Sequence, residues 1–115
     1  MRDGGGICSG ALEGDVHRFP VRVYYEDTDA GGVVYYANYL KFAERARTEM
    51  MHLVGAGYGD AVRAGKVAFA VRRCEIDFLA PARLDDLLEV ETRLLEAGGA
   101  SLSAEQRIRR EGDEI

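Results

Sequence analysis

The sequence predicts an α+β fold in which one antiparallel sheet wraps around one long helix. Three observations support this prediction. A segment rich in β-branched and aromatic residues, 16–25, comes first, and a single segment with helical periodicity, 36–54, follows it. From residue 67 onward the chain has the pattern of a meander of strands. Helices segregated from an antiparallel sheet are typical of the α+β class, and 115 residues are enough for one domain.

The first strand is predicted over residues 16–25, "VHRFPVRVYY". Pro20 has no backbone N–H to donate, so it places this strand at a sheet edge or near a strand start. The preceding residues, 1–15, hold five of the 14 glycines and show little periodicity. We therefore predict a disordered or tag-like tail over 1–15 and a folded domain over 16–115.

The helix is predicted over residues 36–54, because apolar residues recur there at helical spacing. These residues are Tyr39, Ala43, Ala46, Met50 and Leu53. Asn38 is a candidate N-cap, since its side chain can accept a hydrogen bond from a free amide of the first turn. Gly55 is a natural place for the helix to end.

Three more strands are predicted over residues 67–79, 87–96 and 101–110. In the first of them, Cys74, Ile76 and Phe78 alternate with charged residues, which indicates one apolar face. The short glycine-containing stretch "AGGA" predicts a hairpin between the last two strands.

Composition excludes several classes of protein. The net charge of -5 and the pI near 5.0 argue against a nucleic-acid partner, because phosphate contacts need a basic surface. No apolar run reaches the roughly 20 residues of a membrane span. The first 15 residues lack the apolar core of a signal peptide, so we expect a cytoplasmic protein. Cys8 and Cys74 have no motif spacing, and we predict reduced thiols rather than a disulfide.

The stretch "EDTDAGG", residues 26–32, places three carboxylates and two glycines just before the helix. A calcium loop is disfavoured, because Gly31 stands where that loop needs an oxygen donor and Asn38 stands where it needs a bidentate Glu. Neither phosphate-binding glycine motif is present. A Ser–His–Asp site also lacks parts, since His17 and His52 have no nucleophile in their sequence context.

A carboxylate beside a helix N-terminus is a different possibility for this stretch. The first amide N–H groups of a helix have no internal partner and can stabilise a developing oxyanion. A nearby carboxylate can attack a carbonyl or take a proton from attacking water. From composition alone, the simpler interpretation is that Glu26, Asp27 and Asp29 only cap a turn, because Asp and Gly are the commonest turn residues.

The stretch "VYYEDTDAGGVVYYANYLKFAERARTEMM" resembles the signature of the 4-hydroxybenzoyl-CoA-thioesterase-like proteins. Within that family it is most similar to the acyl-CoA thioesterase branch associated with the Tol–Pal system. The matching motif, D-x-x-G followed by two hydrophobic residues, x-[Y/H]-x-N-Y, covers residues 29–39. "EIDFLAPARLDDLLEV" and "SLSAEQRIRR" match later strands, so the resemblance spans residues 18–110. It implies a hotdog fold, an antiparallel sheet around a central helix, and the hydrolysis of acyl-CoA.

By this resemblance Asp29 is the catalytic carboxylate, as nucleophile or general base. Tyr36 provides the backbone N–H that polarises the thioester carbonyl, at a position where some relatives have His. Gly32, Asn38 and Tyr39 match the loop glycine and the helix entry, and we assign them to the substrate-binding surface. The resemblance implies neither a metal nor a cofactor. It also implies a homodimer or homotetramer with the active site at the subunit interface, in line with the small core of a short chain.

Two questions stay open at this point. CoA carries several phosphates whereas the chain is acidic, so local basic residues are needed; the candidates are Arg63, Lys66, Arg72, Arg73 and Arg83. The alternatives to an enzyme are a non-catalytic hotdog module that binds acyl-CoA or acyl carrier protein, and a small α+β scaffold.

The stretch "RIRREGDEI", residues 107–115, ends the sequence with a Glu-Gly-Asp turn between two β-like segments, which predicts a hairpin. Related hotdog proteins carry a further strand there, between the meander and the strand that follows the helix. We therefore expect either that the sequence is part of a longer chain or that a neighbouring subunit supplies this strand.

Overall fold

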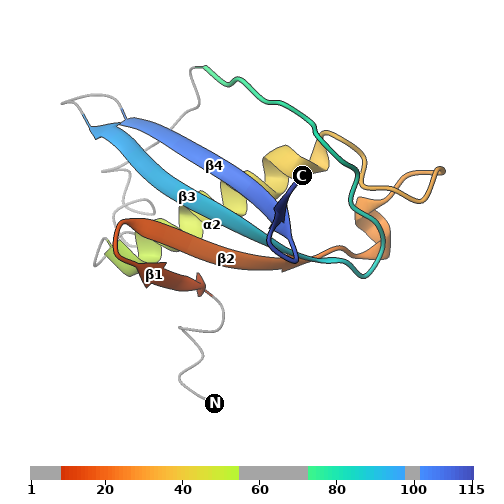
Figure 1. Ribbon diagram of the computed structural model, residues 1–115, viewed down its shortest axis with the longest axis horizontal. Helices are drawn as coiled ribbons and strands as arrows, with labels where there is room; N and C mark the ends of the chain where they lie inside the picture. The colour runs from red at the N-terminus through yellow and green to blue at the C-terminus, as the bar shows by residue number, and fades with distance from the viewer. Residues whose placement is uncertain (1–8, 55–72, 98–101) are drawn as a thin grey trace, which may run out of the picture.

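The computed structural model describes residues 9–54, 73–97 and 102–115 (Figure 1). The described strands form one antiparallel sheet in the order β1-β2-β3-β4-β5. These strands are β1 (Ala11–Glu13), β2 (Val16–Arg22), β3 (Leu87–Ala97), β4 (Leu102–Arg110) and β5 (Asp113–Glu114). A 3-10 turn, η1 (Tyr25–Asp27), and a long helix, α2 (Asn38–Val54), lie between β2 and β3 in the sequence.

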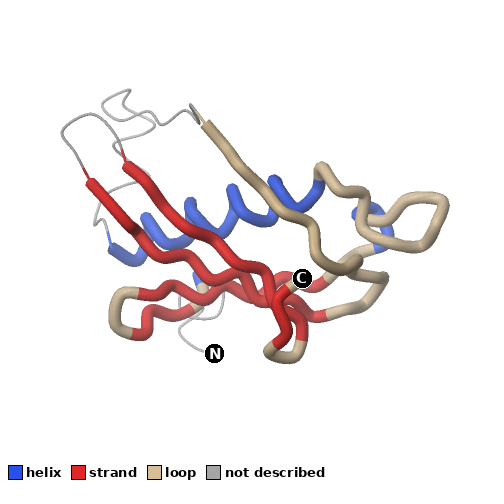
Figure 2. Tube along the Cα trace, turned by 45° about the horizontal axis from the view of Figure 1, so that its top comes forward, coloured by secondary structure: helices blue, strands red, loops and turns tan. Residues whose placement is uncertain are grey.

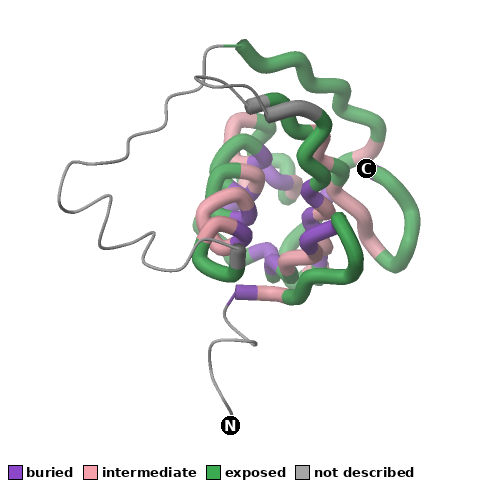
Figure 3. The backbone as a smooth tube through the Cα atoms, turned by 90° about the vertical axis from the view of Figure 1, so that its left-hand side faces the viewer, coloured by how far each residue is buried: buried purple, intermediate pink, exposed green. Residues whose placement is uncertain are grey.

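The core lies between α2 and one face of the sheet (Figure 2). Buried residues of the helix and of the strands face one another across this layer (Figure 3). The cluster is made of Val21, Val23, Val34, Tyr39, Phe42, Ala46, Ala82, Leu88, Val90 and Ile115. The predicted arrangement, one sheet around one helix, is therefore confirmed.

The helix differs from its prediction in two details. Its most deeply buried large side chain is Phe42, which is fully buried, whereas Leu53 is 38% exposed. The apolar face of the helix is therefore centred on Phe42. The prediction used Ala43 instead, because periodicity alone does not distinguish these two neighbouring positions. The predicted N-cap role of Asn38 is wrong: α2 begins at Asn38, and the Asn38 side chain donates to the backbone of Asp27. Gly55 lies outside the described residues.

The N-terminal strands also depart from the sequence pattern. Residues 11–13 were expected in a tail, but they form β1, which pairs with residues 16–18 of β2. Pro20 lies beyond this pairing and has no strand partner on that side among the described residues, as predicted for a proline in a strand. The first strand ends at Arg22 rather than at residue 25, because residues 25–27 turn into η1.

The strand predicted over residues 67–79 is not formed in its described part. Residues 73–79 are extended, yet they belong to no described strand; residues 67–72 lie outside the described residues. The amides of Leu79 and Ala80 both donate to the carbonyl of Ile115, and the Ile115 amide donates to Ile108 of β4. The final hairpin is confirmed, and its two turn residues, Glu111 and Gly112, have φ of 54° and 88°.

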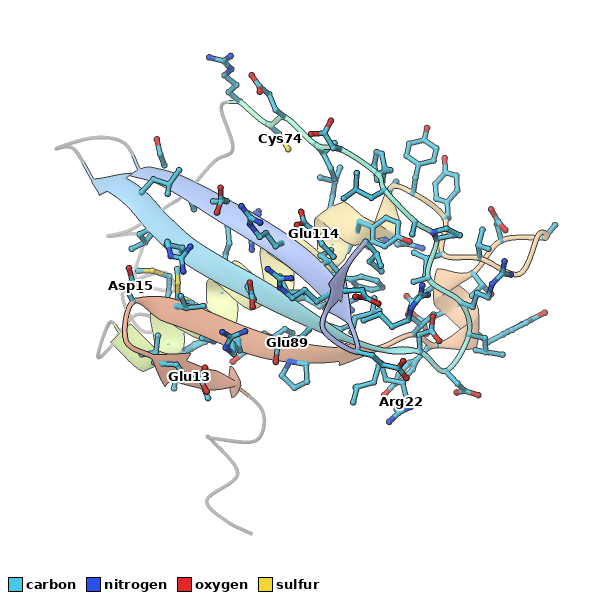
Figure 4. The ribbon with its side chains drawn as sticks, viewed as in Figure 1. Glu13, Asp15, Arg22, Cys74, Glu89 and Glu114 are labelled. Atoms are coloured by element: carbon cyan, nitrogen blue, oxygen red, sulfur yellow. The ribbon has the colours of Figure 1, made fainter. Side chains whose placement is uncertain are left out.

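The face of the sheet that points away from α2 is charged. Arg18 of β2 binds the carboxylates of Glu13, Glu89 and Glu91, and Arg109 reaches Glu91 at 3.1 Å (Figure 4). Burial by itself raises the pKa of Glu91, but hydrogen bonds from Arg109 and Arg18 outweigh it and hold the pKa below its ordinary value. The sheet therefore has one polar and one apolar face, and the helix covers the apolar one.

Candidate active site

The acid–glycine stretch forms a tight hairpin. Thr28 and Val34 pair in an antiparallel bridge, and the Asp29 amide donates to the Val33 carbonyl at 2.9 Å. The Gly32 amide donates to the Asp29 carbonyl at 3.0 Å, and Gly32 has a φ of 79°. This is a three-residue hairpin loop whose last position needs positive φ, which explains the glycine.

The Asp29 carboxylate is exposed and held by its own turn. Its Oδ1 accepts a hydrogen bond of 2.8 Å from the amide of Gly31. Among the described residues, no donor reaches Oδ2. The turn therefore restricts the orientation of the carboxylate while one oxygen stays accessible. The turn-capping interpretation and the catalytic one are compatible, since they use different oxygens.

Asp27 has a different role from Asp29. It is buried, its Oδ2 accepts from the Tyr24 amide at 2.8 Å, and its carbonyl accepts from the Tyr35 amide and from Asn38 Nδ2. Asp27 and Asn38 thus join the hairpin to the start of α2. Residue type alone does not distinguish this structural carboxylate from Asp29, because both lie in the same short polar stretch.

The start of α2 leaves amide groups available. Asn38, Tyr39 and Leu40 donate to carbonyls three residues earlier, whereas in the described part of the chain the amide of Tyr36 donates to no acceptor. The first turn of α2 contains no acidic residue, so no side chain there offsets the positive end of the helix dipole. This end can accept developing negative charge.

Aromatic rings surround this helix start. Tyr36 is 60% exposed and packs edge-on against Phe78, with the ring centroids 5.9 Å apart. Tyr35 lies against Tyr36, and hydrogen bonding to Tyr36 raises the pKa of Tyr35 above its ordinary value. Phe78 also contacts Tyr39, whose buried hydroxyl accepts from the Ala82 amide at 3.0 Å.

The structure brings the predicted site residues together in one region, because the hairpin of Asp29 and Gly32 leads directly into the helix start of Tyr36, Asn38 and Tyr39. Asn38 and Tyr39 turn inward, toward Asp27 and Ala82. Phe78 was missed. It is 39 residues from Tyr39 in the sequence, and only the tertiary fold makes them neighbours.

The histidines lie away from this region. His17 is fully buried beside Ser9, with Nε2 2.7 Å from the Ser9 carbonyl, and His52 is exposed near the end of α2. Within residues 9–54, 73–97 and 102–115, no three His, Cys, Asp or Glu side chains gather as a metal site would require. No helix in the described part of the chain has both the length and the apolar character needed to cross a membrane.

Comparison with known proteins gives a consistent result. Residues 31–115 match the model of the thioesterase superfamily. An acyl-CoA thioester hydrolase, YbgC of Escherichia coli O6:H1, is 55% identical over 91 residues, which are 79% of this chain and 67% of that protein. The acyl-CoA thioesterase YbgC of Haemophilus influenzae is 52% identical over 92 residues, 80% of this chain and 68% of that protein.

Solved structures agree. A probable thioesterase from Bartonella henselae superposes with a TM-score of 0.79 at 39% identity, over 87% of this chain and 83% of that one. The 4-hydroxybenzoyl CoA thioesterase of Pseudomonas sp. strain CBS-3 has a TM-score of 0.75 at 24% identity, over 84% of this chain and 70% of that one, a similarity of fold alone. The hotdog fold predicted from the sequence is confirmed.

Proposed function

Because the chain belongs to the thioesterase superfamily and is a thioester hydrolase, we propose that it cleaves acyl-CoA with the carboxylate of Asp29, while the amide N–H of Tyr36 polarises the thioester carbonyl. The observation that carries this proposal is the Asp29 hairpin. It holds an exposed carboxylate by one oxygen, leaves the other accessible, and continues directly into the start of α2.

The chemistry needs few groups. As the carbonyl carbon becomes tetrahedral, its oxygen gains negative charge, which the Tyr36 amide and the positive end of α2 stabilise. Oδ2 of Asp29 either attacks this carbon, giving an anhydride that water opens, or takes a proton from the water that attacks it. In both routes the C–S bond breaks, the CoA thiolate leaves and is protonated, and the free acid is released.

The proposal is tested by hydrolysis of a panel of short, long and aromatic acyl-CoAs, with the released CoA thiol as readout. We expect turnover of at least one member of the panel. Binding of acyl-CoA or acyl carrier protein without release of thiol would instead favour a non-catalytic module. Absence of both would leave only the scaffold interpretation.

We also propose that two copies of the chain complete the site. Exposed apolar residues lie at the 3-10 turn η1, at the start of α2 and in the extended segment 73–79; they are Tyr24, Tyr25, Tyr35, Tyr36, Leu40, Ile76, Phe78 and Leu79. An apolar surface of this kind is typical of an interface between subunits. The extended segment also presents backbone groups that another strand can pair with.

The expected assembly is a homodimer or a dimer of dimers at micromolar concentration, measured by sedimentation velocity. Leu79→Asp, at a residue 62% exposed beside Phe78, is expected to weaken both assembly and turnover, because it places a charge in the interface. Leu12→Asp, at a residue 42% exposed on β1, is the matched control and should change neither. A wild-type monomer with full activity would contradict this prediction.

A further inference from the structure

The catalytic hairpin is part of a small ladder of its own. Thr28 pairs with Val34, so Asp29 lies opposite Val33, and on the other side Val33 pairs with Arg83. Residues directly opposite each other in an antiparallel ladder project to the same face. Val34 and Ala82, the neighbours of this row, are buried. Asp29, Val33 and Arg83 therefore form a row on the outward face, and the backbones of Asp29 and Arg83 lie about 10 Å apart, two strand spacings.

The turn that carries Arg83 is held on several sides. The Ala82 amide donates to the Tyr39 hydroxyl, and the Ala82 carbonyl accepts from the Val34 amide at 2.8 Å. The Arg83 amide donates to Asp86 Oδ2 at 2.9 Å. This hydrogen bond is the main reason why the pKa of Asp86 lies below its ordinary value. A hydrogen bond from Arg110 also lowers this pKa, whereas burial acts in the opposite direction. The backbone of Arg83 is thus fixed relative to the Asp29 hairpin.

The guanidinium of Arg83 stays accessible. Arg83 is exposed and forms no ion pair with any described residue, although its charge helps to lower the pKa of Asp86 from a distance. Asp86, in the same turn, already binds Arg110 at 2.8 Å. Six other described arginines do form ion pairs with carboxylates: Arg18, Arg73, Arg93, Arg107, Arg109 and Arg110.

Other described cations without a carboxylate partner lie elsewhere. Lys41, Arg45 and Arg47 belong to α2, and Arg22, at the end of β2, donates to the carbonyl of Asp85 (Figure 4). Among the described cations, Arg83 is the one whose backbone pairs with the catalytic hairpin itself.

We propose that Arg83 binds a phosphate group of the CoA moiety, an inference that rests on the proposed function. The pantetheine arm separates the thioester from the phosphates, so a cation for them belongs at a distance from Asp29 rather than beside it. A guanidinium can hold a phosphate through two parallel hydrogen bonds. In a chain of net charge -5, such a local cation also offsets the repulsion of an anionic substrate. Of the basic residues predicted for this role, Arg73 binds Glu75, and Arg63, Lys66 and Arg72 lie outside the described residues.

The test compares Arg83→Gln with wild type on two substrates. One is the acyl-CoA that the wild type hydrolyses best, and the other is the N-acetylcysteamine thioester of the same acid, which carries no phosphate. For acyl-CoA we expect KM to rise about tenfold or more with kcat nearly unchanged, the size of one charged hydrogen bond. For the truncated thioester we expect no change. Arg83→Lys should restore part of the loss, because it returns the charge without the two-pronged geometry.

Two controls keep the result specific. Arg93→Gln removes the same charge at an exposed position of β3 and should leave both substrates unaffected. Raising the salt concentration should increase the KM of wild type for acyl-CoA and change that of Arg83→Gln less, since screening acts on the missing contact. An equal loss on both substrates, or no loss on either, would overturn the inference. A wild type that hydrolyses neither substrate would overturn the proposed function itself.

Discussion

Asp29→Asn is expected to abolish thioester hydrolysis while the protein stays folded. The amide has the size of the carboxylate, and its Oδ1 can still accept the hydrogen bond from Gly31 that closes the turn. It is neither a base nor a good nucleophile at neutral pH. We therefore expect turnover to fall by about 10²- to 10⁴-fold, the usual contribution of a catalytic acid or base. The measurement is steady-state hydrolysis of the preferred acyl-CoA, with circular dichroism to verify the fold.

Glu26→Gln is the matched control for this substitution. It makes the same chemical change at an exposed carboxylate of the same stretch, three residues earlier, and should leave turnover nearly unchanged. If Asp29→Asn lowered turnover by less than about tenfold, the loss would be only ~1.4 kcal/mol of transition-state stabilisation. The assignment of Asp29 as the catalytic carboxylate would then be wrong.

Phe42→Ala is expected to have the largest effect on stability. Phe42 is fully buried in the middle of the layer between α2 and the sheet, with its ring edge-on to Tyr39 at 6.1 Å. Removing a buried phenyl ring loses its transfer free energy and leaves a cavity, which together cost about 3–5 kcal/mol. This is a large part of the free energy of unfolding of a typical domain, about 5–15 kcal/mol. Urea unfolding measures the loss of unfolding free energy. Both proteins are compared at the same concentration, because assembly also contributes to stability.

Leu53→Ala on the same helix is the comparison. Leu53 lies near the end of α2, outside the proposed interface, and is 38% exposed, so its truncation removes less buried area and leaves no enclosed cavity. We expect a clearly smaller loss of unfolding free energy than for Phe42→Ala. Losses of similar size would mean that α2 does not pack on the sheet through Phe42, and the described core would need revision.

Local patterns were sufficient for most of the secondary structure. The helical spacing of Tyr39, Ala46 and Met50 identified α2, and the alternation in residues 87–96 and 101–110 identified β3 and β4. Gly112 marked the final hairpin, and it has positive φ as such a turn requires. These features depend on neighbours within a few residues, which is why one sequence is enough to recognise them.

The pairing of strands decided which segments outside these patterns form part of the sheet. β1 has only three residues and no periodicity, and it exists because the edge of β2 is available beside it. Residues 73–79 have strand-like alternation, yet in the described chain they form no ladder. Whether an alternating segment becomes a strand depends on a partner for its backbone groups, which its own sequence does not contain.

For the candidate active site, one sequence was enough to locate the stretch with the relevant chemistry, in which an aspartate and two glycines precede a helix start. The folded chain was needed to show which carboxylate is buried and which is accessible, because Asp27 and Asp29 differ in their contacts and not in their residue type. It also placed Phe78 beside Tyr36 and paired Arg83 with Val33. These contacts join residues about 40 to 50 positions apart, and they form because burial of the α2 face against the sheet brings the hairpin and the turn before β3 to the same place.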